Sequence, residues 1–496
     1  MDLDRLPVLV GAAQVTQRDV PLDEALSAPD LLERVSRAAF EDAGAGARAA
    51  AGLDLVGMVA MIGWRNLNPP QLLADRLGAS SARAVLTAVG GEMPLRFVDH
   101  VAREIAAGRV RSALVCGTHN LRTLRRASVA GTRVAWDESS RGMPELYGEN
   151  KAGTNEQELA YGLDRPSSVY PIFENALRAR RGLGLAAHQA RMGELMSRFT
   201  QVAAGNPHAW FPVARGAAEL AQPSASNRMV AFPYTKYLNA VIETDQAAAL
   251  WLTSAANALS LGVPKDRLVH VWGGASAVER AWYASERPDF AACPALGATV
   301  RAALARAGTD LDAIGHFDFY SCFPVAVEMA CEMLGLDESD PRGLTVTGGL
   351  PYAGGPGNNY TLHSLVSMVE RLRAAPGSLG LVTGNGWYLT KHSALVCSAT
   401  APEKPGEDAL PEAGPERVAP VAVAEGAGVL ETYTVLYDRE GAPARGIAIG
   451  RLESGERFLA NTALDRDALG DFAAREQVGR RGRVRHVDGR NLFEPL

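Results

Sequence analysis

The stretch IGHFDFYSCFPVAVEMACEMLGL, residues 314–336, carries the strongest information about the fold. Its first seven residues are an apolar and aromatic run typical of a buried strand, and Ser321-Cys322-Phe323 follows as a sharp elbow. Pro324 stands where a helix tolerates proline, in the first turn, and an apolar helix-forming run comes after it. This order of strand, elbow and helix predicts an α/β unit whose strand belongs to a parallel sheet.

A second unit of the same kind begins earlier in the chain. The run ARAVLTAV at residues 82–89 predicts a strand, Gly90-Gly91 its elbow, and Pro94 the first turn of the following helix. Each unit continues to another buried strand, SALVCG at residues 112–117 and SLGLVTGNG at residues 378–386. We therefore predict two duplicated halves in which the two elbows correspond.

The composition is that of an ordinary globular chain. With 496 residues, 47% of them hydrophobic, and a formal net charge of −6, it predicts several domains and no general attraction for nucleic acid or membranes. No apolar run approaches the ~20 residues that span a bilayer, and the N-terminus lacks the order of a signal peptide. The five scattered cysteines include no C-x-x-C pair, which favours a reducing compartment. We expect the cytoplasm.

The chain divides into five predicted segments. Alternating strands and helices give way to an insertion rich in arginine, asparagine, proline and aromatic residues, which either builds a ligand site or is a solvated cap. A proline-rich, acidic stretch later marks an extended linker. The boundaries are 1–122 for the first half, 123–240 for the insertion, 241–400 for the second half, 401–420 for the linker and 421–496 for the C-terminal region.

The C-terminal region predicts a small all-β domain. At least three short strands are separated by turns at Glu440-Gly441 and Ser454-Gly455, a pattern compatible with an OB-like barrel. Its string GRRGRVRHVDGR forms a basic cluster, which either binds phosphates or belongs to a solvated or domain-docking strand.

Cys322 is the most interesting thiol. Placed at a helix start with Ser321 as a possible cap, it lies where the helix dipole favours thiolate, as a nucleophile requires. The alternative is a small buried hydrophobe, since free cysteines are often buried. Cys116, Cys331 and Cys397 are predicted to be core residues.

Two tyrosines and two glycine-rich loops are further candidates. Tyr320 and Tyr352 could act as acid or base if their environment shifts the pKa of the phenol. The loop VTGGLPYAGGPGNNYTLHS at residues 346–364 and the turn at residues 383–386 can aim backbone N–H groups at an oxyanion or phosphate. No spacing of histidine, cysteine and acidic residues predicts a metal site.

Over residues 6–398 the chain resembles the thiolase superfamily. PVLVGAAQ at residues 7–14 is similar to the first thiolase strand, and YSCF at residues 320–323 stands where sterol-carrier-type thiolases have H-D-C-F. GGLPYAGGPG at residues 348–357 stands where thiolases have a glycine-rich segment with G-H-P. More narrowly, the chain resembles the thiolase-like proteins of type 1, which carry an additional C-terminal domain.

The resemblance implies a five-layer αβαβα core of two similar halves, a loop domain that holds coenzyme A, and Claisen or retro-Claisen chemistry on acyl-CoA. Coenzyme A would be part of the substrate, with no covalently bound cofactor. Thiolases usually dimerise through the edge strand of the core, and both a homodimer and a monomer stay open here. Five residues are assigned to binding of the acyl-CoA: His208, Arg228, Lys236, Asn358 and Asn385.

The catalytic positions implied by the resemblance are mostly changed. The acyl-accepting cysteine falls at Gly91 and the histidine of G-H-P at Gly355. Cys322 alone matches a functional position, with Tyr320 in place of the histidine of H-D-C-F. The backbone N–H groups of Gly91, Gly355 and Gly386 could still form oxyanion holes.

We therefore predict a protein of lipid metabolism that binds acyl-CoA, belongs to the acyltransferase superfamily and lacks standard thiolase chemistry. Its catalytic candidates are Cys322, Tyr320 and Tyr352. One alternative is a retro-aldol lyase on a β-hydroxyacyl-CoA, with Tyr320 and Tyr352 as its phenols and the C-terminal domain as a fused OB-fold partner. The other alternative is a non-catalytic scaffold that binds acyl-CoA.

Overall fold

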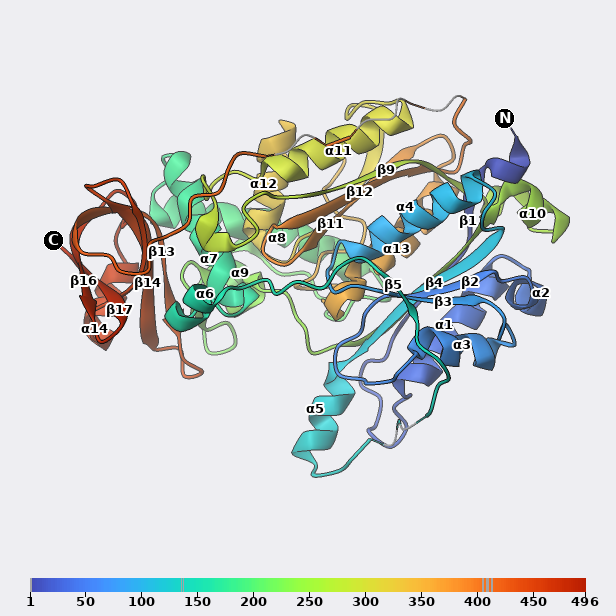
Figure 1. Ribbon diagram of the computed structural model, residues 1–496, viewed down its shortest axis with the longest axis horizontal. Helices are drawn as coiled ribbons and strands as arrows, with labels where there is room; N and C mark the ends of the chain where they lie inside the picture. Colours follow the sequence, from blue (N-terminus) through green and yellow to red (C-terminus); the bar gives the residue numbers. More distant parts are fainter. Residues whose placement is uncertain (1, 135, 137, 404–405, 407–409, 412–413) are drawn as a thin grey trace.

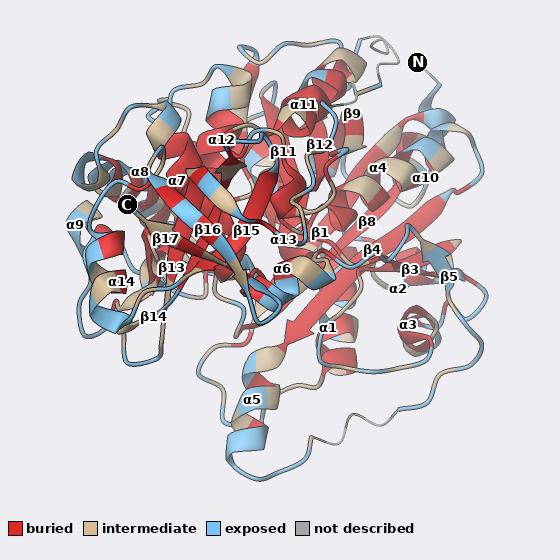
Figure 2. Ribbon diagram, turned by 60° about the vertical axis from the view of Figure 1, so that its left-hand side comes forward, coloured by how far each residue is buried: buried red, intermediate tan, exposed pale blue. Residues whose placement is uncertain are grey.

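The computed structural model describes residues 2–134, 136, 138–403, 406, 410–411 and 414–496. Ten strands form one large sheet, in which two halves meet where β1 and β9 pair at only two positions. Figure 2 shows most of these strands buried between helices, whereas β5 at one edge of the sheet is largely exposed. In order across the sheet, the strands are β10 (Ile314–Asp318), β11 (Leu379–Gly386), β12 (Lys391–Ser398), β9 (Val269–Val278), β1 (Pro7–Thr16), β8 (Asp245–Ser254), β4 (Ser112–Asn120), β2 (Leu55–Met58), β3 (Arg83–Thr87) and β5 (Glu145–Tyr147).

Helices complete a five-layer αβαβα core (Figure 1). α4 (Met93–Ala106) and α13 (Tyr360–Ala374) contact strands of both halves and contact each other, so they form the central layer. α1 (Ala28–Asp42) and α3 (Pro69–Leu77) cover the outer face of the first half. On the second half, α11 (Pro294–Ala307) lies against β9 and β12, with α12 (Pro324–Leu334) packed on it. This confirms the predicted α/β fold of two similar halves.

The correspondence between the halves differs from the prediction. The strand order β10-β11-β12-β9 repeats the order β2-β4-β8-β1, so α13 is the counterpart of α4 and α12 that of α3. The second half has an irregular segment, residues 335–356, where the first half has β3. The elbow at Gly90-Gly91 therefore corresponds to the glycine-rich loop before α13, and not to the elbow at Ser321-Cys322. Two elbows with similar local sequence signals lie in different layers.

The regular structure of the insertion after the first half is mostly helical. α7 and α8 pack against α12, whereas α5 stands away from the layered core (Figure 1). Its elements are α5 (Leu121–Val129), α6 (Glu156–Tyr161), α7 (Pro166–Arg180), α8 (Leu185–Gly205), α9 (Ala217–Ala221), β6 (Met229–Ala231) and β7 (Tyr234–Thr235). Between the halves, α10 (Ala255–Ser260) follows β8. No helix among the described residues is long and apolar enough to cross a membrane.

The C-terminal region forms a small closed barrel. Five strands pair in the cycle β13-β14-β15-β17-β16, as expected for an OB-like domain, and β6 of the insertion pairs with β13 from outside. The region also contains one helix, α14 (Arg466–Ala473), which an all-β prediction left out. The strands are β13 (Gly426–Tyr437), β14 (Pro443–Leu452), β15 (Arg457–Thr462), β16 (Arg481–Val487) and β17 (Arg490–Pro495). Much of the predicted linker, at 404–405, 407–409 and 412–413, lies outside the described residues.

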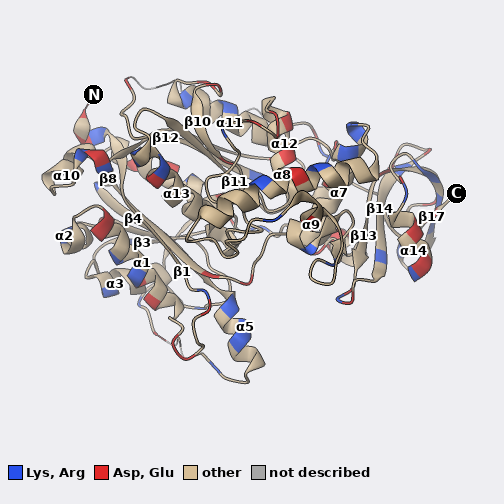
Figure 3. Cartoon of the chain, turned by 180° about the vertical axis from the view of Figure 1, so that it is seen from behind, with Lys and Arg blue, Asp and Glu red and all other residues tan. Residues whose placement is uncertain are grey.

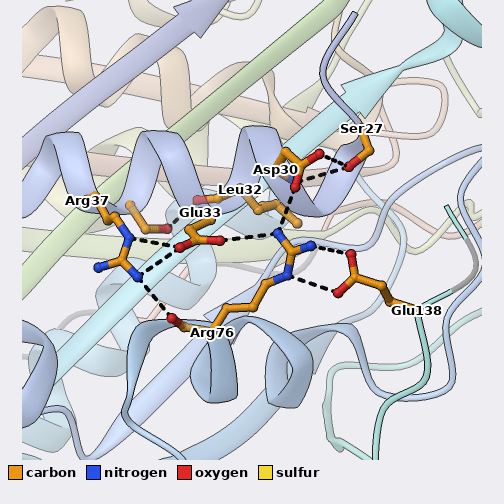
Figure 4. A network of polar contacts seen from close by, with 8 residues as sticks. Ser27, Asp30, Leu32, Glu33, Arg37, Arg76 and Glu138 are labelled. Carbon is orange, nitrogen blue, oxygen red and sulfur yellow. Dashed lines mark hydrogen bonds and ion pairs between the residues drawn. The ribbon is translucent and has the colours of Figure 1, made fainter.

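One edge of the large sheet is covered by the chain itself. β5 pairs in parallel with β3, and Arg83 and Glu145 form an ion pair of 2.8 Å beside this pairing. The segment that leads to β5 is fastened to the outer helices, because Glu138 binds Arg76 of α3, which also contacts Asp30 of α1 at 2.9 Å (Figure 4). β3 is therefore not free to pair with another chain.

Candidate functional site

The position implied for the acyl-accepting cysteine lies in the central layer, just before α4. A Cβ atom at Gly91 would collide with the hydroxyl group of Tyr320 and would lie 2.6 Å from the carbonyl oxygen of Asn385. The backbone here is fastened to the loop before α13, since Gly90 N–H donates to Asn358 Oδ1 at 3.0 Å and Thr361 Oγ1 donates to Gly91 O at 2.9 Å. The Tyr320 phenol thus occupies the space beside the elbow, and no side chain at position 91 fits.

The cavity left at this inner site is very small. A void of about 10 Å³ borders Tyr320, Asn385 and His392, room for about one water molecule. Burial, with Cys322 and Glu92 nearby, raises the pKa of Tyr320 well above its usual value. The phenol is therefore a hydrogen-bond donor and not a base at neutral pH.

Cys322 lies in the same buried region, behind Tyr170. The Tyr170 ring stacks on Phe323 with ring centroids 4.5 Å apart, and its hydroxyl accepts a hydrogen bond from Asn385 Nδ2 at 2.7 Å. Burial raises the pKa of the Cys322 thiol to about 12, although Tyr170, the backbone and Asn385 lower it in part. Desolvation thus outweighs the effect of the helix start, and the thiol stays protonated. Of the two interpretations, a buried hydrophobe fits this environment better than a nucleophile.

A buried ion pair lies beside the elbow at Gly90-Gly91. Lys391 Nζ lies 2.7 Å from Glu92 Oε1 and donates to Val89 O at 2.6 Å, and both side chains are at most 6% exposed. Burial raises the pKa of Glu92, while Lys391 lowers it. Only glycine fits at Gly90 and Gly386, because a Cβ at either would collide with the Glu92 carboxylate.

The remaining predicted site residues are divided between different places. Gly355 N–H donates to Val241 O at 2.8 Å, so this N–H is already used, against the prediction that it serves an oxyanion. The Tyr352 hydroxyl is buried without a partner in the described structure, and burial raises its pKa. His208 borders a separate small void beside His363. Neither Tyr352 nor His208 lines the cavity at Tyr320.

A much larger cavity lies outside the core. This outer groove, of about 1260 Å³, runs between α5, the loops of the insertion and the turn after β13. Its floor is formed in part by Ala240 and Val241. Ala240 N–H donates to Cys322 O at 2.9 Å, so one stretch of backbone separates the groove from the inner site.

The outer groove is strongly basic. Seven of its lining residues are cationic and two are acidic. One of the cations, Arg125, is paired with Glu243, whereas Arg122 has no side-chain partner in the described structure. Figure 3 shows the positive charge along α5. The cationic residues are Arg18, Arg122, Arg125, Arg126, Arg228, Lys236 and Arg439.

Several of these residues were missed from the sequence. The string LRTLRR at residues 121–126 is a readable basic signal, although the basic cluster predicted from the sequence is the one that contains the arginines of β16. None of those β16 arginines lines the groove. No local sequence pattern predicts the ion pair of Glu92 with Lys391, because the two residues are far apart in the chain. Arg439 stands in what looks like an ordinary hairpin turn.

Two buried clusters have the ligand types of a metal site. They are Glu279, Cys293 and His392, and Glu174, His188 and Glu328. Each already has a guanidinium that supplies positive charge, since Arg287 lies 3.4 Å from Glu279 and Arg181 lies 2.6 Å from Glu328. A metal ion would have to compete with these ion pairs.

Comparison with known families places these features in context. A family model described as the thiolase-like protein type 1 additional C-terminal domain matches residues 410–490. No curated protein matches the chain.

Solved structures match over most of the chain. A monomeric SCP2-thiolase-like protein type 1 from Mycobacterium smegmatis is 34% identical, with 99% of both chains covered and a TM-score of 0.84. An acetyl-CoA acetyltransferase from Syntrophomonas wolfei is 14% identical, with 80% of this chain and 100% of that chain covered and a TM-score of 0.57. The Ltp2–ChsH2(DUF35) aldolase is 18% identical, with 81% of this chain and 99% of that chain covered and a TM-score of 0.60. The last two show likeness of fold alone.

Proposed function

The chain belongs to the SCP2-thiolase-like proteins of type 1, and on this basis we propose that it binds coenzyme A thioesters in the outer groove without transferring their acyl group. The observation that carries the proposal is the charge of the groove. Seven cationic and two acidic residues line a cavity of about 1260 Å³. Such a surface attracts anionic ligands of substantial size. Coenzyme A, with a diphosphate and a 3′-phosphate, is a ligand of this kind.

The groove offers more than charge. Trp210, Phe211 and Ile242 line it, and Phe211 and Ile242 expose 43% and 49% of their surface. An adenine ring or a pantetheine arm can cover such apolar surface. Val241, which lines the groove, accepts a hydrogen bond from Gly355 N–H, so the groove lies beside the glycine-rich loop. We propose that the thioester end of a bound ligand lies on this side.

The inner site supports the absence of acyl transfer. Covalent catalysis needs a nucleophile that is accessible and activated. Gly91 has no side chain, and Cys322 is 7% exposed with a thiol pKa of about 12. The void beside Tyr320 is too small for an acyl group.

Carbon–carbon cleavage is a second candidate, favoured by one observation. The Tyr320 hydroxyl lies at the implied position of the cysteine side chain, where a reacting carbonyl or β-hydroxyl group would be placed. With its raised pKa, Tyr320 could donate a proton but not remove one. Tyr352 would then have to serve as the second phenol, although it does not line the cavity at Tyr320.

Calorimetry together with turnover assays tests both candidates. We expect the full chain to bind coenzyme A, and to bind dephospho-coenzyme A more weakly because one phosphate is missing. Mass spectrometry should find no acyl adduct after incubation with acetoacetyl-CoA, and neither acetoacetyl-CoA nor a β-hydroxyacyl-CoA should be consumed. Absence of coenzyme A binding would refute the proposal. Tyr320-dependent cleavage of the β-hydroxyacyl-CoA would establish the second candidate instead.

Other features support two further proposals, on the assembly and on the location of the protein. Since β5 covers the edge of β3, we propose that the chain is a monomer, as its Mycobacterium smegmatis relative is described. All five cysteines are free and buried, which supports a reducing compartment such as the cytoplasm. A ligand of the acyl-CoA class would place the protein in lipid metabolism.

A further inference from the structure

Three cations of the outer groove lie in one row that crosses from the insertion into the C-terminal barrel. Lys236 N–H donates to Arg228 O at 2.8 Å, directly beyond the pairing of Met229 with Thr235 in β6 and β7. On the other side of β6, Ala231 pairs with Leu436 of β13 in antiparallel register.

The pairing of β6 with β13 places a residue of the barrel next to Arg228. Continued three residues beyond the Ala231–Leu436 pair, it brings Arg439, in the turn after β13, to the level of Arg228. The hydrogen bond from Arg228 Nη1 to Asp438 O, at 3.3 Å, confirms that the two segments lie side by side. Lys236, Arg228 and Arg439 therefore stand next to one another on three consecutive segments, and all three line the groove.

The row is not neutralised by the protein. Arg228 donates to two carbonyl oxygens, and in the described structure the side chains of Lys236 and Arg439 have no hydrogen-bond or ion-pair partner. The nearby carboxylate of Asp438 is used elsewhere, because it accepts from Ala442 N at 2.8 Å and pairs with Arg466 at 3.2 Å. Like charges on adjacent strands repel one another. An anion between them would remove that repulsion.

We propose that Lys236, Arg228 and Arg439 together bind phosphate groups of the groove ligand, so that the C-terminal barrel completes the binding site. The proposal rests on the proposed function for the identity of the ligand, a coenzyme A thioester, and adds Arg439 as a binding residue from the additional domain. Arginine forks and a lysine ammonium are well suited to phosphate oxygens.

The hairpin that carries Arg439 is built to stay in place. Gly441 has a φ of 86°, which favours glycine, and a Cβ added there would lie 3.6 Å from Arg228 Cβ. The Asp438 carboxylate accepts from the backbone of Glu440 and Ala442 and so closes the turn. The turn backbone is therefore fixed, while the Arg439 side chain is exposed and available to a ligand.

Calorimetric titration with coenzyme A tests the row in the full chain. Arg439→Gln and Lys236→Gln should each weaken binding about tenfold, because each removes one charge-assisted contact. The matched control is Arg483→Gln, which should change affinity less than about twofold, because Arg483 on β16 is exposed, has no side-chain partner among the described residues and lies outside the groove. Circular dichroism should show that all three variants remain folded.

A second titration with inorganic pyrophosphate separates the two proposals. If the wild-type chain and the Arg439→Gln variant bind coenzyme A equally well, the phosphate-binding role proposed for the row is wrong, whereas the proposed function stands. If the chain does not bind coenzyme A, and binds pyrophosphate only when Arg439 is present, the proposed function is wrong. The phosphate-binding role of the row then stands. If neither probe binds, both are overturned.

Discussion

The inner site and the outer groove use charge in opposite ways. At the inner site Glu92 and Lys391 neutralise each other inside the protein, and the void beside Tyr320 measures about 10 Å³. In the groove, Arg122, Lys236 and Arg439 have no side-chain partner in the described structure and face about 1260 Å³ of open volume. Removing the partner of a buried charge destabilises the fold, whereas a charge left open is available to a ligand.

Under the proposed function, this difference explains how a thiolase fold can bind a ligand without the usual reaction centre. The inner site is filled by local features, since the glycine at position 91 leaves room for the Tyr320 hydroxyl. The groove is built from α5, the insertion and the barrel, and it does not depend on which side chains fill the elbow. Substitutions in the two regions should therefore have different consequences.

Replacing Lys391 should have the largest effect. Lys391→Met leaves the Glu92 carboxylate buried without its cation, and we expect the free energy of unfolding to fall by about 4 kcal/mol. Urea unfolding measures it. The double variant Glu92→Gln/Lys391→Met should recover part of the loss, since no carboxylate then remains to be paired. A loss below about 1 kcal/mol in the single variant would show that the ion pair does not stabilise the elbow.

Adding one methyl group at the elbow tests the filled space directly. Gly91→Ala should lower the free energy of unfolding by about 3 kcal/mol, because the new Cβ meets the Tyr320 hydroxyl and the Asn385 carbonyl group. In a Tyr320→Phe background the same substitution should cost less, since the hydroxyl oxygen, the nearest of the three atoms that the new Cβ meets, is removed. Equal costs in both backgrounds would mean that the hydroxyl does not occupy this position.

The pH dependence of stability tests a buried histidine of the central layer. Burial, with His208 nearby, lowers the pKa of His363 to about 3, and its ring lies 3.0 Å from Gln14 Oε1. The unfolded chain binds a proton at this residue below pH ~6.5, so its contribution to stability is present above that pH and is lost as the pH falls toward 3.

Between pH 7 and pH 5 the wild-type chain should therefore lose about 2 kcal/mol more stability than His363→Gln. Urea unfolding at both pH values gives the comparison, in which the other titrating groups cancel. An identical pH dependence in the two proteins would contradict the lowered pKa.

The sequence predicts the layers better than the site, for a physical reason. Strand periodicity, the elbows and Pro94 or Pro324 at helix starts are local signals, and they correctly predict an α/β core of two halves. They cannot show which helix is central, because that depends on sheet order. The second half has no strand that corresponds to β3. The sequence therefore predicts α12 as the counterpart of α4, whereas in the structure the counterpart is α13.

The site residues depend on contacts between distant segments. Tyr320 reaches Gly91, Lys391 reaches Glu92, and Arg439 comes level with Arg228 only through the pairing of β6 with β13. The family resemblance identified Gly91 as a changed catalytic position, but it could not show what fills the space. Arg228 and Lys236 were predicted because the resemblance implies a coenzyme A-binding loop domain, and the contribution of the barrel was not visible.

The smallest effect on stability, and the sharpest contrast with Lys391, is expected for Arg122. Its guanidinium is exposed on α5 with no partner in the described structure, so Arg122→Gln should change the free energy of unfolding by less than about 0.5 kcal/mol. If the groove binds coenzyme A, the same substitution should weaken binding several-fold, about 1 kcal/mol, and reduce its dependence on salt, because one cation facing the phosphates is lost. Calorimetry at low and high salt, beside urea unfolding, measures both quantities. A stability loss comparable to that of Lys391→Met, with unchanged affinity, would mean that the groove cations serve the fold and that the distinction between the two regions is wrong.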